Sequence, residues 1–184
     1  MENGVETGIS QRVAGSERAE AAAENFRQGY NCAQSVCLAF ADVLKLDRET
    51  ILKLSSSFGG GMGRLREVCG AVSAMFMIAG VMRGYSSPND DTVKSAHYAL
   101  IQSLAEEFKA QHGTIICREL LGLDNKGAVL PENTPESVSE SASEGTAASA
   151  FSPEASKRTE EYYAKRPCEA FIRTAAEIIE SVVL

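Results

Sequence analysis

The sequence has no tryptophan, and only 7% of its 184 residues are aromatic. A hydrophobic core must therefore be built from Ala, Leu, Ile, Val and Met, and this Ala-, Leu- and Glu-rich composition favours helix. An excess of basic residues is also missing. The net charge is −7, whereas a protein that binds nucleic acid normally carries a basic face. These absences predict an all-α fold, a compact helical bundle, with no nucleic acid among its partners.

Long apolar runs are absent too. Residues 1–20 contain no hydrophobic segment of the kind found in signal peptides. The longest uncharged stretch, residues 68–82, is too short to span a bilayer comfortably and is expected to form a buried helix. We therefore expect a cytoplasmic protein without membrane insertion. In that reducing compartment, five cysteines favour metal binding or redox chemistry over structural disulfides.

The chain is long enough for one domain, and two segments differ from the rest in composition. Residues 1–15 are polar and are expected to be disordered. From about residue 123 to about residue 156 the chain is rich in Ser, Thr, Pro and Ala, and it carries six acidic residues and one lysine. Such a composition cannot offset the entropy cost of ordering, so we predict a flexible insertion there. Apart from this insertion, residues 16–184 are predicted to form a single helical domain, which contains the four cysteines described below.

Apolar periodicity and capping residues place the helices. Ser16, Asn31 and Asp47 are suitable N-caps. An apolar stripe from Val93 to Phe108 predicts the clearest amphipathic helix. The expected helices cover residues 16–28, 32–45, 48–56, 69–82, 90–111 and 114–121, with a last one after Pro167. The glycine-rich segment 58–63 predicts a tight loop, in which the backbone has positive φ or approaches another group closely.

Four cysteines, Cys32, Cys69, Cys117 and Cys168, each lie where one of these helices is expected to begin. Unpaired backbone N–H groups and the helix dipole favour a thiolate at that position. The thiolate is the form that attacks disulfides and binds metals. Helix N-termini that meet at one end of a bundle would bring the four sulfurs together. Cys37 lies on a different face of its helix from Cys32 and is expected in the core.

The spacing of the cysteines excludes two common sites. No CxxC motif is present, so neither a zinc ribbon nor a thioredoxin motif is predicted, and a CxxCH haem attachment site is also absent. Arg64 and Arg66 precede Cys69. They would either stabilise a thiolate and offset the negative charge of a cofactor, or form a solvated pair on a loop. The only histidines, His97 and His112, are expected to have structural roles.

Several of these segments together resemble the C_GCAxxG_C_C family of redox-active proteins. They are residues 30–33 (YNCA), 58–63 (FGGGMG), 68–71 (VCGA) and 117–122 (CRELLG), followed by Cys168. The resemblance implies that Cys32, Cys69, Cys117 and Cys168 are the four cysteines of the family and that the protein has a redox role. The chain departs from the motif at Ala74, where the family has a glycine, and in its insertion.

The first functional hypothesis is an iron–sulfur cluster held by the four cysteines, in an electron carrier or redox sensor. Gly60, Gly61 and Gly70 would leave room for such a cofactor and are predicted cofactor-binding residues. One alternative is a thiol–disulfide redox protein in which the same cysteines are redox-active in pairs. Others are a structural zinc site with four cysteine ligands, or cysteines that only pack.

In the redox hypotheses the protein is an oxidoreductase or a redox accessory protein with an unknown redox partner. The Ala- and Gly-rich helices could also support a homodimer. No residue stands out as a general acid or base, so hydrolytic and transferase chemistry has no support in the sequence.

Overall fold

The computed structural model describes residues 16–123 and 152–183. Within these residues the chain is mostly helical and forms no extended strand, and an isolated antiparallel bridge joins Val68 to Ile116. The predicted all-α fold is confirmed. The predicted disordered N-terminus and residues 124–151 of the predicted insertion lie outside the described residues.

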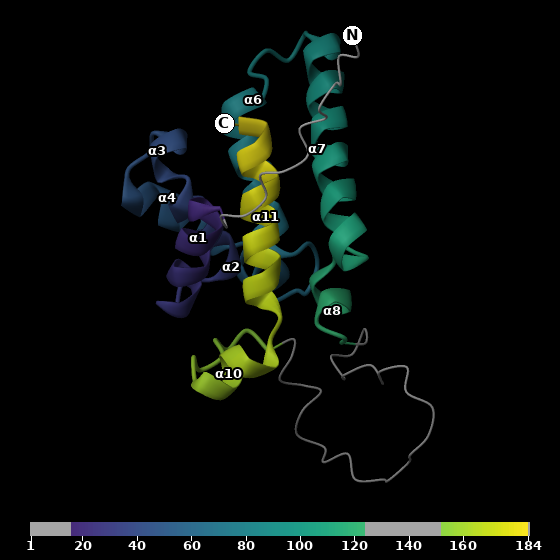
Figure 1. Cartoon of the computed structure of the whole chain (residues 1–184). Coiled ribbons are helices and arrows are strands. Elements are labelled where there is room, and N and C mark those ends of the chain that lie inside the picture. Colours follow the sequence, from purple (N-terminus) through teal and green to yellow (C-terminus); the bar gives the residue numbers. More distant parts are fainter. Residues whose placement is uncertain (1–15, 124–151, 184) are drawn as a thin grey trace, which may run out of the picture.

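The long helix α11 lies between the short N-terminal helices and α7, and α6 also packs on it (Figure 1). α11 contacts α1, α2, α6 and α7, so it forms the centre of the bundle. The helices are α1 (Glu17–Arg27), α2 (Cys32–Ala39), α3 (Ala41–Leu44), α4 (Arg48–Ser56), α5 (Gly59–Met62), α6 (Gly70–Arg83), α7 (Asp91–His112), α8 (Cys117–Leu120), α10 (Glu160–Lys165) and α11 (Cys168–Val183).

The core contains apolar residues of α1, α2, α4, α6, α7 and α11, and α6 and α11 contribute many of them. The helix α6 was predicted to be buried; residues 70–75, Ile78 and Ala79 are, Phe76 and Met77 are partly buried, and Val81 and Met82 near its end are exposed. On α11, the predicted residues Phe171, Ala175, Ile178 and Ile179 are buried, whereas Val182 is only partly buried. None of the described helices is both long and apolar enough to cross a membrane.

The predicted helix 32–45 is not continuous, and a contact from another helix explains the break. In an unbroken helix the carbonyl of Ala39 would accept from the N–H of Val43. Instead Val43 N donates to Phe40 O at 3.0 Å. The Ala39 carbonyl accepts from Arg18 Nη1 of α1 at 2.7 Å. The chain therefore turns at Phe40, and α2 and α3 are separate helices.

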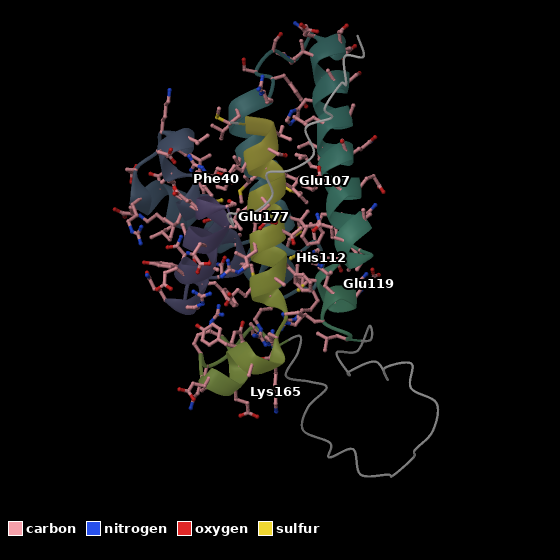
Figure 2. The ribbon with its side chains drawn as sticks, viewed as in Figure 1. Phe40, Glu107, His112, Glu119, Lys165 and Glu177 are labelled. Carbon is pink, nitrogen blue, oxygen red and sulfur yellow. The ribbon has the colours of Figure 1, made fainter. Side chains whose placement is uncertain are left out.

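The predicted apolar stripe of α7 is buried over only half its length. Leu104, Ala105 and Phe108 are buried, but Val93 is 44% exposed. The first half of α7 is thus an exposed helix. At its other end, His112 lies between α7 and α11 (Figure 2), and its Nε2 is 2.9 Å from Thr174 Oγ1. The six-residue helix α10 was not predicted from the sequence.

Candidate functional site

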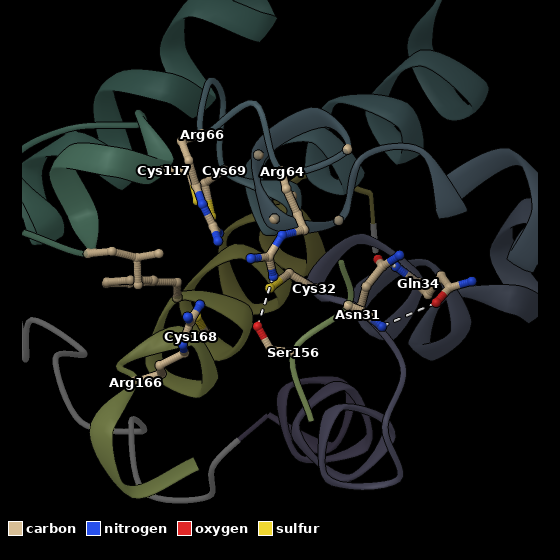
Figure 3. A pocket seen from close by; sticks show the side chains of 18 of the residues that line it. Asn31, Cys32, Gln34, Arg64, Arg66, Cys69, Cys117, Ser156, Arg166 and Cys168 are labelled. Carbon is tan, nitrogen blue, oxygen red and sulfur yellow. Dashed lines mark hydrogen bonds between the residues drawn. The ribbon is translucent and has the colours of Figure 1, made fainter. Parts of the chain in front are cut away.

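The four predicted cysteines lie at the starts of four helices. Cys32, Cys117 and Cys168 are the first residues of α2, α8 and α11, and Cys69 is the N-cap of α6. All four line a single cavity of about 450 Å³ at one end of the bundle (Figure 3). The prediction that each cysteine begins a helix is confirmed, and the fold gathers residues that are far apart in the sequence.

A short backbone pairing holds Cys69 and Cys117 near one another. Cys69 N donates to Ile115 O at 2.8 Å, and Cys117 N donates to Glu67 O at 2.6 Å. These bonds flank the bridge between Val68 and Ile116. The start of α6 and the start of α8 are therefore fixed by main-chain bonds, independently of any bound group.

Two glycines permit the close approach of the cysteine-bearing segments. A Cβ on Gly61, whose φ is +71°, would lie 2.6 Å from Cys117 Cβ. A Cβ on Gly70 would lie 2.7 Å from Phe58 O and 3.2 Å from Cys32 Cβ. Both glycines line the cavity, as does Gly60. Their structural role is to let the backbones meet at the cysteines, and their predicted role in cofactor binding stays a prediction.

A capping box fixes Cys32 at the start of α2. Asn31 Oδ1 accepts from Gln34 N at 2.9 Å, and Asn31 N donates to Gln34 Oε1 at 3.1 Å. Asn31 Nδ2 also donates to Ser56 O at 3.0 Å, which ties α2 to the end of α4. Asn31 and Gln34 both line the cavity (Figure 3). The capping box and the hydrogen bond to α4 therefore fix the start of α2, and with it the position of Cys32.

Arginines form the other part of the cavity wall. The described lining residues include Arg64, Arg66, Arg158 and Arg166 and no aspartate or glutamate. Arg66 is only 1% exposed and is hydrogen-bonded to Cys117. Of the two readings for Arg64 and Arg66, the solvated pair is wrong for Arg66, because burial removes it from water.

Arg64 binds the last part of the predicted insertion. Its Nε donates to Ser152 O at 2.5 Å, and its Nη1 donates to Ser156 Oγ at 2.8 Å. Residues 152–156 thus lie at the cavity. Sequence reasoning missed Arg158 and Arg166. Only the nearness of Arg166 to Cys168 in the sequence could have pointed to one of them.

The profile of a family described as "Putative redox-active protein (C_GCAxxG_C_C)" matches residues 30–182. The chain belongs to this family. The match covers most of the chain and includes all four cavity cysteines and all four cavity arginines. No curated protein and no solved structure matches the chain.

In this C_GCAxxG_C_C protein, the helix starts do not make all four cysteines acidic, contrary to the prediction. Burial raises the pKa of Cys69 to about 12, although the backbone N–H groups of Ala71 and Val72 act in the opposite direction. Burial also raises the pKa of Cys117, against the nearby charge of Arg66. Desolvation of a thiolate therefore outweighs the helix N-terminus at these two positions.

Cys32 and Cys168 behave as a pair. Their side chains share a hydrogen bond, which lowers the pKa of Cys168 to about 7 and raises that of Cys32 well above its ordinary value. The positive charges of Arg166, Arg158 and Arg66 also lower the pKa of Cys168. Of the two thiols, Cys168 is therefore the one that loses its proton first, while Cys32 stays a thiol.

Cys37 is separate from this site. It is buried in the core, 3% exposed, as predicted. It does not line the cavity, and burial raises its pKa to about 12. All five cysteines are free thiols in this structure. Among the described residues, no group of three or more His, Cys, Asp and Glu side chains is arranged to hold a single metal ion.

Proposed function

We propose that this protein is a thiol–disulfide redox protein in which Cys32 and Cys168 cycle between a dithiol and a disulfide. The observation that carries the proposal is that Cys32 and Cys168 line the wall of one cavity, close enough for each to shift the pKa of the other. Membership of a family of redox-active cysteine proteins supports it.

Cys168 is the attacking sulfur. Its thiolate attacks one sulfur of a substrate disulfide, the substrate S–S bond breaks, and one half of the substrate leaves as a thiolate that takes a proton from water. The product is a mixed disulfide between Cys168 and the other half. Arg166 and Arg158 favour this step because their charges stabilise the attacking thiolate.

Cys32 completes the reaction. The hydrogen bond to Cys168 is the first cause of the raised pKa of Cys32. That cause disappears when the Cys168 sulfur enters the mixed disulfide, because it no longer carries a negative charge. Cys32 then loses its proton to water and attacks the Cys168 sulfur, and the second substrate half leaves as a thiolate. Two electrons pass from the dithiol to the substrate, and a partner dithiol reduces the new Cys32–Cys168 disulfide.

A second candidate is the iron–sulfur cluster predicted from the sequence, with Cys32, Cys69, Cys117 and Cys168 as ligands. The observation that favours it is that all four sulfurs line one cavity whose described wall contains arginines and no carboxylates. Thiolates are the usual ligands of such clusters, and the arginines would offset its negative charge. When bound, a cluster would supply one-electron transfer. The zinc alternative stays a prediction.

The four cysteines distinguish these two candidates, because a cluster uses all of them and the disulfide cycle uses two. The protein would be purified without oxygen, assayed for iron and acid-labile sulfide, and then reacted with bis(2-hydroxyethyl) disulfide. For disulfide cycling we expect mass spectrometry to find a Cys32–Cys168 disulfide, and Cys69→Ser and Cys117→Ser to retain the reaction.

Two variants identify the attacking sulfur, and one provides the control. Cys32→Ser should accumulate a mixed disulfide on Cys168, whereas Cys168→Ser should lose the reaction. Cys37→Ala, in the core, should react like the wild type. Two results together would instead establish the cluster and overturn disulfide cycling. The wild type would contain iron and sulfide that each of the four Ser variants loses, and no Cys32–Cys168 disulfide would form.

A further inference from the structure

We propose that Arg158 and Arg166 form a carboxylate-binding subsite beside Cys168, so that the preferred substrates are small thiols and disulfides that carry a carboxylate. The substrate preference rests on the proposed function, but the binding of a carboxylate does not. The packing of the two arginines, their hydrogen bonds and the size of the cavity support the subsite.

Both arginines are held by aromatic faces. The guanidinium carbon of Arg158 lies 4.6 Å from the ring centre of Tyr162 and 4.9 Å from that of Phe26. That of Arg166 lies 4.8 Å from the ring centre of Tyr162. A ring contacts the flat face of a guanidinium and leaves the N–H groups at its edge available for a planar acceptor. Tyr162 thus fixes two guanidinium groups in position without neutralising either.

The hydrogen bonds of Arg158 are incomplete within the described residues. Its Nη2 donates to Tyr30 O at 3.4 Å. Its Nη1 is buried and has no hydrogen-bond partner among the residues that the structure describes. No ion pair joins Arg158 or Arg166 to a carboxylate in that part of the chain. A buried N–H group without an acceptor is unfavourable, and a ligand carboxylate would supply one with the matching charge.

The cavity places this charge next to the reactive sulfurs. Arg64 and Arg66 enter it from the loop before α6, and Arg166 enters from the segment before α11, close to Cys168 (Figure 3). The starts of α6 and α11 face the same space and add the positive ends of two long helices. A carboxylate bound at Arg158 and Arg166 would therefore hold an attached sulfur near Cys168.

The size and depth of the cavity restrict the substrate to small molecules. Its volume of about 450 Å³ lies in the range typical of small-molecule sites. Cys168 is 7% exposed, so a disulfide on the flat surface of a folded protein would not reach its sulfur. A low-molecular-weight disulfide can enter the cavity and present one sulfur to Cys168.

Three disulfides of similar length and different charge test the preference. They are 3,3′-dithiodipropionate, bis(2-hydroxyethyl) disulfide and cystamine, which are anionic, neutral and cationic. Each rate of reduction is divided by the rate at which a free small thiol reduces the same compound, because the leaving thiols differ in pKa. We expect the normalised rate for the anion to exceed that for the cation by about tenfold or more, and the ratio to shrink as salt is added.

Variants of the subsite should change the ratio of the rates for anionic and neutral disulfides, in addition to any effect on the overall rate. Arg158→Gln combined with Arg166→Gln should lower the ratio of anionic to neutral rates about tenfold. Arg83→Gln is the matched control, because Arg83 is an exposed arginine at the far end of α6. The overall rate is not a sufficient readout, since the loss of Arg166 also changes the reactivity of Cys168 toward every disulfide. The ratio of two substrates cancels that effect.

Binding is measured separately with suberate, the carbon analogue of 3,3′-dithiodipropionate. Suberate should slow the alkylation of Cys168 by iodoacetamide in the wild type but not in the double Gln variant. Equal normalised rates for the three disulfides, without protection by suberate, would overturn the subsite and leave disulfide cycling intact. Protection by suberate without reduction of any disulfide would support the subsite and overturn the proposed function.

Discussion

The two ends of the bundle use the same long helices in different ways. At the end where α6 and α11 begin, glycines, cysteines and arginines surround a cavity. At the end where they terminate, Val81 and Met82 are exposed, and Val182 lies against the exposed first half of α7. The same two helices therefore carry a site with cysteines and arginines at their starts, whereas their ends border an open hollow against α7 whose described lining contains no cysteine.

The cysteine end contains residues that are poor choices for stability. A buried arginine such as Arg66 must be removed from water, and an apolar side chain of similar volume often stabilises a protein more. Glycine at the start of α6 weakens the helix but admits Cys32. Such residues are retained where a site requires charge and close approach, which the other end does not.

The largest difference in the effect of two substitutions on the free energy of unfolding is expected between the two halves of α7. Leu104 is 1% exposed and Val93 is 44% exposed, although they are eleven residues, or about three turns, apart on one stripe. Leu104→Ala should lower the free energy of unfolding by about 2–5 kcal/mol. Val93→Ala should change it by less than about 0.5 kcal/mol. Urea denaturation measures both.

The same pair of variants tests the predicted homodimer. If a second copy covers the first half of α7, Val93→Ala should lower the free energy of unfolding nearly as much as Leu104→Ala does. This decrease should also grow with protein concentration. A small loss at every concentration would show that this half is exposed in solution.

Two glycines of α6 offer a second comparison. A Cβ on Gly70 would lie 2.7 Å from Phe58 O, whereas a Cβ on Gly80 meets nothing within 4 Å. Gly70→Ala should destabilise the protein by about 1–3 kcal/mol and slow the formation of the Cys32–Cys168 disulfide. Gly80→Ala should stabilise it by about 0.5–1 kcal/mol, because alanine favours helix.

Equilibrium unfolding and the rate of disulfide formation read out the two effects separately. If Gly70→Ala were as stable as the wild type and oxidised as fast, the start of α6 would not depend on its approach to Cys32.

The sequence predicts the helices well because periodicity and capping are local properties. Ser16, Asn31 and Asp47 cap helices as expected. The break at Phe40 was missed because it depends on Arg18, which lies on another helix. The exposure of the first half of α7 was missed for a similar reason. An apolar stripe shows which face of a helix can be buried. How much of that face is buried depends on where α6 and α11 pack against it.

The sequence likewise predicts the local features of the site and misses those that depend on packing. The four cysteines and Gly61 and Gly70 follow from motifs and helix starts. The pairing of Cys32 with Cys168 does not, because it depends on how α2 and α11 meet. The pKa values also depend on burial, which the sequence does not give, so the expectation of four acidic thiols failed at Cys69 and Cys117.

The third comparison is between Cys168 and Cys37. The pKa of Cys168 is about 7 and that of Cys37 is about 12. Alkylation of Cys168 by iodoacetamide should rise through pH 7 and level off above it, while Cys37 in the same molecule stays unmodified at pH 8. Mass spectrometry after timed alkylation gives both rates. A Cys168 rate that rose only above pH 8 would contradict the paired thiolate.

The same shift affects stability with a defined sign. Between about pH 7 and pH 9.0, the ordinary value for a cysteine, Cys168 is a thiolate in the native state and a thiol in the unfolded state. The unfolded state therefore binds more protons, and the contribution of Cys168 to the free energy of unfolding grows with pH across this window. It is lost as the pH falls through 7. Cys168→Ser should remove this contribution.

The smallest expected difference is between two helix caps. Asp90 Oδ1 accepts a hydrogen bond from Val93 N at 3.0 Å at the start of α7. The role of this side chain is to cap the helix. Asn31 caps α2, accepts a bond within a capping box, and also donates to Ser56 O. Asp90→Ala should cost about 0.5–1 kcal/mol, in the ordinary range for a cap. Asn31→Ala should cost about 1–2 kcal/mol, because it removes both the side-chain cap and the hydrogen bond that joins α2 to the end of α4.

Urea denaturation of both variants resolves a difference of this size when the slopes of the transitions agree. Disulfide formation provides the sharper readout. Asn31→Ala frees the helix start that holds Cys32 and should slow its reaction with Cys168, whereas Asp90→Ala should leave that rate unchanged. Equal stability losses with equal oxidation rates would mean that Asn31 is only a cap. The cysteine end would then owe its geometry to Gly61, Gly70 and the backbone pairing of Cys69 and Cys117 alone.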